Sequence, residues 1–249
     1  MNEINAFGNV EPKLMEEKMN EVIPKFNKII NVLNYLRSDL INELGLDDDK
    51  TEGWKLLDKN IKFQLGNKKK NVLDDIDFLR KNIIHSYSKT LVHFDNLNQL
   101  RELSQEHKTE MYWFVYNAQI SVRLLGTLDD YLYRCIHDFN GYNLKYNSKF
   151  QSELKRKLSQ KKCLSLVKAL NKKDETLRLY RNDITHNFNM FGNRLLSKVK
   201  RSDGIIGYGS TKPKIESKEH FIKNFEEMIE KMNNKYLNVY NEYQKNRVF

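Results

Sequence analysis

Residues that break helices or build special sites are scarce in this chain. Its 249 residues include only three prolines, ten glycines and two cysteines. So few prolines and glycines favour long helices over short strands joined by turns. Cys135 and Cys163 stand singly among apolar neighbours, so they provide neither a disulfide framework nor zinc-ligand spacing. We therefore expect no metal, no cofactor and a reducing, cytoplasmic environment.

Long apolar runs are lacking as well. No stretch approaches the roughly 18 apolar residues of a membrane span. The N-terminus has neither the basic start nor the apolar run of a signal peptide. The chain is 39% hydrophobic and 31% charged, with leucine, isoleucine and aromatic residues throughout, which is typical of a globular protein with a core. We expect no membrane partner.

Apolar residues recur at steps of three and four, the pattern of amphipathic helices. We expect an all-α fold, an antiparallel bundle of about five to six long helices. Asn71 and Thr109 are the expected N-caps of two of them, and Pro24 is expected to break the first. The glycine-rich residues 201–215 predict a small hairpin. The predicted helices are residues 12–44, 54–65 (closed by Gly66), 71–107, 109–138, 148–170, 174–196 and a last helix that starts at 217.

The chain divides into three expected parts. Residues 1–66 form an N-terminal helical segment that packs on the bundle, residues 67–200 form the helical core, and residues 201–249 hold the glycine-rich loop and the C-terminal helix. The formal net charge is +10, and its excess lies in residues 155–201, with 14 Lys/Arg and 3 Asp/Glu. Such a segment attracts polyphosphate by electrostatic steering and counterion release. The other interpretation is a solvated lysine-rich face.

The strongest candidate site lies inside this basic segment. Arg181 and His186 are separated by four residues in the predicted helix 174–196. Arginine keeps its charge and histidine changes charge near neutral pH, so the pair could hold a phosphate and move a proton. Arg181 and His186 are five residues apart, which turns a helix by roughly 140°, so they lie on different faces. Asn182 and His186 are four residues apart and share a face. From spacing alone, an exposed arginine and a hydrogen-bonded histidine are the plainer interpretation.

Residues 181–186, Arg-Asn-Asp-Ile-Thr-His, resemble the signature of the HEPN superfamily. That signature is an arginine, four to six residues and a histidine, most often with asparagine directly after the arginine. RNA-guided CRISPR effector ribonucleases and many bacterial toxin and abortive-infection proteins share this form. The resemblance covers residues 71–200 and implies a bundle of four or five helices with the motif near the start of a late helix.

The resemblance implies metal-independent cleavage of RNA by attack of the ribose 2′-hydroxyl. His186 would act as general base or acid, Arg181 would hold the phosphate, and Asn182 would orient the histidine. It also implies a homodimer, because HEPN sites are assembled from two facing motifs, and a toxin or phage-defence role with an antitoxin or inhibitor protein as a partner. Further contacts to RNA are expected from neighbouring basic and aromatic residues, namely Arg178, Tyr180, Lys172, Lys173 and Tyr208. For Tyr180, packing in the core is an equal alternative.

A second stretch repeats the spacing. Arg80 and His85 are also separated by four residues, but Lys81 replaces the usual asparagine, and Ile83 lies on the apolar stripe of its helix. Either the chain holds two HEPN-like units whose motifs meet within one protomer, or one copy is accidental.

Two functions of other classes stay open. The chain could be a non-catalytic helical module that binds RNA or a protein through residues 155–201. It could also be a purely structural helical dimer.

Overall fold

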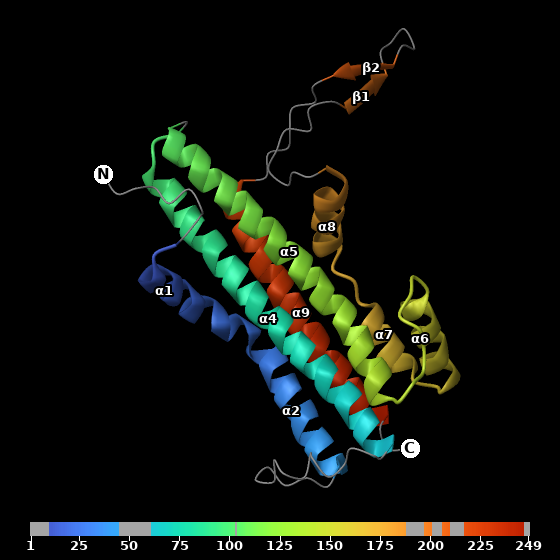
Figure 1. The fold of residues 1–249 in the computed structure, drawn as a ribbon. Helices are drawn as coiled ribbons and strands as arrows, with labels where there is room; N and C mark the ends of the chain where they lie inside the picture. The colour runs from blue at the N-terminus through green and yellow to red at the C-terminus, as the bar shows by residue number, and fades with distance from the viewer. Residues whose placement is uncertain are drawn as a thin grey trace.

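The computed structural model describes residues 10–44, 61–102, 104–187, 197–200, 206–209 and 217–246. Apart from short connections and one small two-stranded ribbon, these residues are helical, which confirms the predicted all-α class (Figure 1). The elements are α1 (Pro12–Val22), a 3-10 turn (Ile23–Phe26), α2 (Asn27–Leu44), α4 (Ile61–Gln99), α5 (Gln105–Phe139), α6 (Phe150–Gln160), α7 (Leu164–Asn171), α8 (Glu175–Asn187), β1 (Ser197–Lys200), β2 (Ile206–Gly209) and α9 (Lys218–Asn246).

The centre of the bundle is an antiparallel pair of very long helices. α4 and α5 make the most extensive helix–helix interface of the described chain, and α9 lies along them (Figure 1). α1 and α2 pack against α4 and α9 on one side, whereas α6, α7 and α8 lie on the other. No helix in the described ranges has the length and apolarity that crossing a membrane requires.

Large aromatic side chains fill the middle of the bundle. Tyr87 of α4 packs on Phe225 of α9 with ring centroids 4.5 Å apart, and Phe114 of α5 contacts Phe221 edge to face. All four are fully buried. Burial of one such side chain contributes about 1.5–3 kcal/mol. The same buried cluster continues into α2 and α7, so the three parts expected from the sequence share one core.

The predicted break at Pro24 is confirmed, since the 3-10 turn separates α1 from α2 there. The predicted stop at Gly66 and N-cap at Asn71 are wrong, because α4 runs through both. A glycine inside a helix costs about 1 kcal/mol, less than burial of the following Val72 and Leu73 provides. Most of the short helix predicted over 54–65 lies outside the described residues.

Thr109 is not the N-cap of α5. The helix starts four residues earlier, where the Ser104 hydroxyl accepts a hydrogen bond from the His107 amide at 3.0 Å. The Thr109 hydroxyl instead donates to the Gln105 carbonyl inside the helix. Ser217 does cap α9, as it accepts from the His220 amide at 3.1 Å.

The predicted helix over 148–170 is two helices. α6 ends at Gln160, Lys162 takes a left-handed conformation with φ of 62°, and α7 follows. This turn allows Leu158 of α6 and Leu166 of α7 both to reach the core. With this interruption and the one at Pro24, only four of the described helices have 18 or more residues, α2, α4, α5 and α9.

The predicted hairpin exists but begins earlier than expected. β1 pairs antiparallel with β2, with Lys198 opposite Tyr208. β2 falls in the glycine-rich segment, whereas β1 precedes residue 201. The predicted C-terminal part of the helix that ends at residue 196 lies outside the described residues after Asn187.

Candidate functional site

The motif helix α8 has a defined start and a defined buried face. Asp174 caps it, because its Oδ1 accepts from the backbone amides of Thr176 and Leu177 at 2.9 and 3.3 Å. Leu177, Tyr180 and Ile184 are buried at steps of three and four. This face fixes the rotation of α8 about its axis, which turns the neighbouring Arg178, Arg181 and Asn182 toward a cavity.

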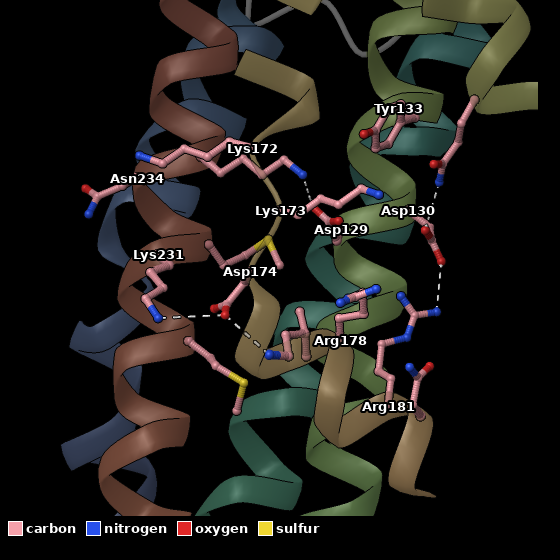
Figure 2. A pocket seen from close by; sticks show the side chains of 16 residues that line it. Asp129, Asp130, Tyr133, Lys172, Lys173, Asp174, Arg178, Arg181, Lys231 and Asn234 are labelled. Atoms are coloured by element: carbon pink, nitrogen blue, oxygen red, sulfur yellow. Dashed lines mark hydrogen bonds and ion pairs between the residues drawn. The ribbon is translucent and has the colours of Figure 1, made fainter. Parts of the chain in front are cut away.

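The cavity has a volume of about 400 Å³ and is formed by α5, α6, α8, α9 and the link between α7 and α8 (Figure 2). An apolar part of its wall comes from Tyr133, Leu177, Met228 and Met232. The excess of basic over acidic groups favours an anionic ligand. The charged lining comprises six basic side chains, Lys172, Lys173, Arg178, Arg181, Lys231 and Lys235, and three carboxylates, Asp129, Asp130 and Asp174.

Each of these carboxylates has a basic partner. Asp129 Oδ1 lies 2.6 Å from the Lys235 ammonium. Asp130 Oδ2 lies 3.4 Å from Arg181 Nη2, and Asp174 Oδ1 lies 3.7 Å from the Lys231 ammonium (Figure 2). Only the first is a short contact, and its lysine is buried. The other two are long enough for a competing anion to displace them.

Burial and neighbouring charges shift the pKa values of Asp129, which lines the cavity, and of Lys155, which lies over the Tyr133 ring beside it. Burial raises the pKa of Asp129 above its ordinary value, although the Lys235 ammonium and a hydrogen bond from it act in the opposite direction. Partial burial lowers the pKa of Lys155, and the positive charges of Lys173 and Lys235 lower it further. The contribution of Lys173 and Lys235 to the shift of the Lys155 pKa reflects the positive charge gathered beside the cavity.

Arg181 lies directly against the backbone of α5. Its Nη1 is 3.4 Å from the Gly126 carbonyl oxygen. A Cβ atom built on Gly126 would be 2.4 Å from Arg181 Cδ and 2.6 Å from its Nε. Glycine is therefore required at position 126 for this position of the guanidinium, whose side chain keeps 41% exposure. The sequence contained no signal for this role, because position 126 lies 55 residues before the motif in an ordinary helical pattern.

The structure brings together five of the residues predicted for the site. Arg181, Asn182, Arg178, Lys172 and Lys173 all line the cavity. The sequence analysis missed Asp129, Asp130 and Lys235, which come from α5 and α9. The local sequence pattern does not indicate these three residues, because only tertiary packing brings α5 and α9 next to α8.

Tyr180 is a core residue, which corrects the expectation that it contacts RNA. Its ring is buried and lies 5.8 Å from that of Phe221, and its hydroxyl accepts a hydrogen bond from Asn224 Nδ2 at 2.8 Å. His186 is in the last turn of α8 and Tyr208 is in β2. The side chains of these two residues lie outside what the structure describes.

The second Arg-x4-His stretch does not join this site. Arg80 is buried and its Nη2 lies 2.7 Å from Asp77 of the same helix. His85 is exposed and faces a shallow groove against α1, where partial burial and the charge of Lys89 lower its pKa. α1 and α8 lie on opposite sides of the α4–α5 pair (Figure 1). The two motifs therefore do not meet within one protomer.

No protein-family model, curated protein or solved structure matches this chain. Its class is defined by fold and site alone, as an all-α bundle in which a late helix presents an arginine and an asparagine to a basic cavity.

Proposed function

We propose that this protein is a metal-independent endoribonuclease of the HEPN type that acts as a toxin or phage-defence effector in the cytoplasm. The observation that carries the proposal is the position of Arg181 and Asn182. Both residues of the Arg-Asn-x-x-x-His motif line a cavity with twice as many basic as acidic side chains.

The reaction needs one anion-binding group and one proton-transfer group. The ribose 2′-hydroxyl attacks the adjacent phosphorus, and the bond from phosphorus to the 5′-oxygen breaks. His186 takes the hydroxyl proton or supplies a proton to the leaving 5′-oxygen, a role that typically contributes about 10²–10⁴-fold to the rate. Arg181 stabilises the charge on the phosphate oxygens, and Asn182 orients the histidine one turn away.

Arg181 must exchange Asp130 for a phosphate. An ion pair this exposed contributes about 0.2–1 kcal/mol, and its separation of 3.4 Å is long. Charge-assisted hydrogen bonds from arginine to phosphate are shorter and about twice as strong as neutral ones. Asp130 therefore serves to hold the guanidinium in place until RNA arrives. A second protomer would supply a second motif, so we propose a homodimer as the active form.

The test is cleavage of labelled single-stranded RNA in EDTA. The wild-type protein should leave 5′-hydroxyl ends, and Arg181→Ala and His186→Ala should each reduce the rate by about 100-fold or more. Arg156→Ala, an exposed arginine of α6 outside the cavity, is the matched control and should cleave normally. Wild-type rates in Arg181→Ala would contradict the proposal.

A non-catalytic RNA-binding module is the second candidate. It is favoured by the cavity's basic lining, which attracts a phosphate chain whether or not His186 acts. If the wild-type protein binds RNA with strong salt dependence and leaves it intact, this candidate replaces the first.

A further inference from the structure

Three aromatic residues form a cluster on α5 far from the cavity. Tyr112 is 61% exposed and Tyr116 is 47% exposed. Their rings are nearly parallel, with an interplanar angle of 11° and centroids 6.3 Å apart. Trp113 meets both edge to face, at 5.1 and 5.6 Å. The indole therefore packs against both tyrosines, whose side chains remain exposed.

This cluster lies in line with the cavity. At 100° per residue, Tyr112, Tyr116, Arg123 and Asp130 fall within an arc of about 40° on α5. Asp130 lines the cavity and holds Arg181. At 1.5 Å per residue, Tyr116 is about 15 Å along the helix from Gly126, where Arg181 rests. A single strand with about 3.4 Å per stacked nucleotide covers that distance with about four nucleotides.

The charge along this row suits a nucleic acid strand. Lys108 and Arg123 are both exposed, one on each side of the tyrosine pair. Lys108, Tyr112, Tyr116 and Arg123 include no acidic residue; Glu110, in the same stretch, bonds to His93 of α4, and Asp130 at the cavity end of the row pairs with Arg181. Such a row combines phosphate-binding cations with exposed aromatic side chains, the combination by which proteins bind single strands without reading sequence. Tyrosine, tryptophan and arginine are also enriched at protein–protein interfaces, so a second protomer is the competing occupant that the experiment below must exclude.

We propose that the row Lys108, Tyr112, Tyr116 and Arg123 binds single-stranded RNA that flanks the cleaved phosphate, with bases stacked on the two tyrosines. This inference rests on the proposed function. It adds that the substrate is unpaired over several nucleotides to one side of the cut. A stacked base typically contributes about 5- to 150-fold to affinity.

Binding is measured without cleavage by use of a 2′-O-methyl 12-mer, which lacks the attacking hydroxyl. The chain has two tryptophans, so Trp54→Phe leaves Trp113 as the only indole reporter. The oligonucleotide should change Trp113 fluorescence on saturation. Tyr112→Ala/Tyr116→Ala should weaken binding at least tenfold, whereas the double phenylalanine variant and Tyr35→Ala, a tyrosine of α2 that is 52% exposed, should stay within twofold.

Oligonucleotide length separates this inference from the nuclease proposal. A dinucleotide cannot reach the tyrosines from Arg181, so the double alanine variant should bind and cleave it like the wild type. Unchanged 12-mer affinity in that variant, or constant Trp113 fluorescence, would overturn the stacking row while leaving the nuclease in place. Tyrosine-dependent binding with no cleavage by the wild type would overturn the nuclease alone. A loss of dimer in the double variant with unchanged RNA affinity would assign the surface to a second protomer and overturn the inference.

Discussion

At the scale of single residues, the position of the proposed phosphate-binding arginine depends on the absence of one methyl group. Arg181 crosses α5 at Gly126, where a Cβ atom would overlap its Cδ and Nε. The overlapping atoms belong to a flexible side chain, so an added methyl group would move the guanidinium and leave the helices in place. Function and stability should therefore respond in opposite directions.

Gly126→Ala tests this arrangement. We expect unchanged or higher stability, because alanine is favoured over glycine inside a helix by about 1 kcal/mol, and a clear loss of RNA cleavage and affinity. Thermal unfolding and cleavage rates measure the two effects. In the Arg181→Ala background the same substitution should have no further effect on cleavage. A wild-type cleavage rate in the single variant would disprove the positioning role.

A buried ion pair is the second residue-scale feature. Lys235 is buried, and its ammonium contacts Asp129 and also lies 5.5 Å from the Tyr133 ring centroid. Asp129 keeps 25% side-chain exposure, and its pKa is already raised by burial. Removal of the lysine would leave a carboxylate whose ionisation the protein disfavours.

Lys235→Met should destabilise the protein by about 3 kcal/mol near neutral pH, at the low end of the range for breaking a buried pair. Without the ammonium, the folded-state pKa of Asp129 rises further. Because the folded protein then binds a proton more readily than the unfolded chain, the loss should shrink as pH falls below that pKa. Urea unfolding at pH 5 and pH 8 measures this, and Asp129→Asn should rescue Lys235→Met. Equal losses at both pH values would show that Asp129 is not the cause.

At the scale of elements, the break between α1 and α2 is stabilised from across the bundle. Asn233 of α9 is buried, and its Oδ1 accepts from the Ile29 amide at 3.2 Å. Its Nδ2 donates to the Lys25 carbonyl and to Ile229 of its own helix. Pro24 ends one helix, and Asn233 satisfies backbone groups that the interruption leaves without helical partners.

Asn233→Leu keeps the approximate volume and removes these bonds. Two buried backbone groups would lose a partner, at about 1–3 kcal/mol each, so we expect a loss of at least about 2 kcal/mol in unfolding free energy. The half-buried Asn234 accepts a solvent-exposed hydrogen bond from Lys28, and Asn234→Ala should change stability by less than about 0.5 kcal/mol. Chemical denaturation measures both, and equal small effects would contradict the role given to Asn233.

At the scale of the whole molecule, the helices form one packing unit. Leu33 of α2, Ile76 of α4, Leu132 of α5 and Tyr236 of α9 line the same narrow apolar gap. The boundary expected at residues 66 and 67 falls inside α4. The helices α1 and α2 therefore contribute side chains to the common core rather than forming a separate layer.

Leu33→Ala tests whether the N-terminal helices unfold together with the rest of the bundle. This substitution should lower the free energy of unfolding by about 2–5 kcal/mol. In the Trp54→Phe background, circular dichroism and Trp113 fluorescence should report the same lowered unfolding midpoint. Trp113 is on the far half of α5, so it would keep its midpoint if the N-terminal helices unfolded separately. Different midpoints from the two measurements would show that the N-terminal helices unfold separately from the rest of the bundle.

Much of the architecture was predictable because helix formation depends on local periodicity. The break at Pro24 and the start of the last helix at about residue 217 follow from local signals and were expected correctly. Errors occurred where tertiary burial outweighed a local signal, as at Gly66, or where the chain turned without proline or glycine, as at Lys162. Tyr180 was misassigned because an aromatic beside an arginine has the same sequence signature in a core as in a binding site.

The sequence by itself determined the helical content, the concentration of basic residues in 155–201 and the placement of Arg181 and Asn182 in that segment. Only the tertiary structure decided that Gly126 and Asp130 contact Arg181, that Asp129 and Lys235 line the same cavity, and that Arg80 and His85 lie elsewhere. The reason is physical. Helical periodicity acts over a few residues, whereas a cavity's charge depends on which side chains from distant segments the buried core brings together.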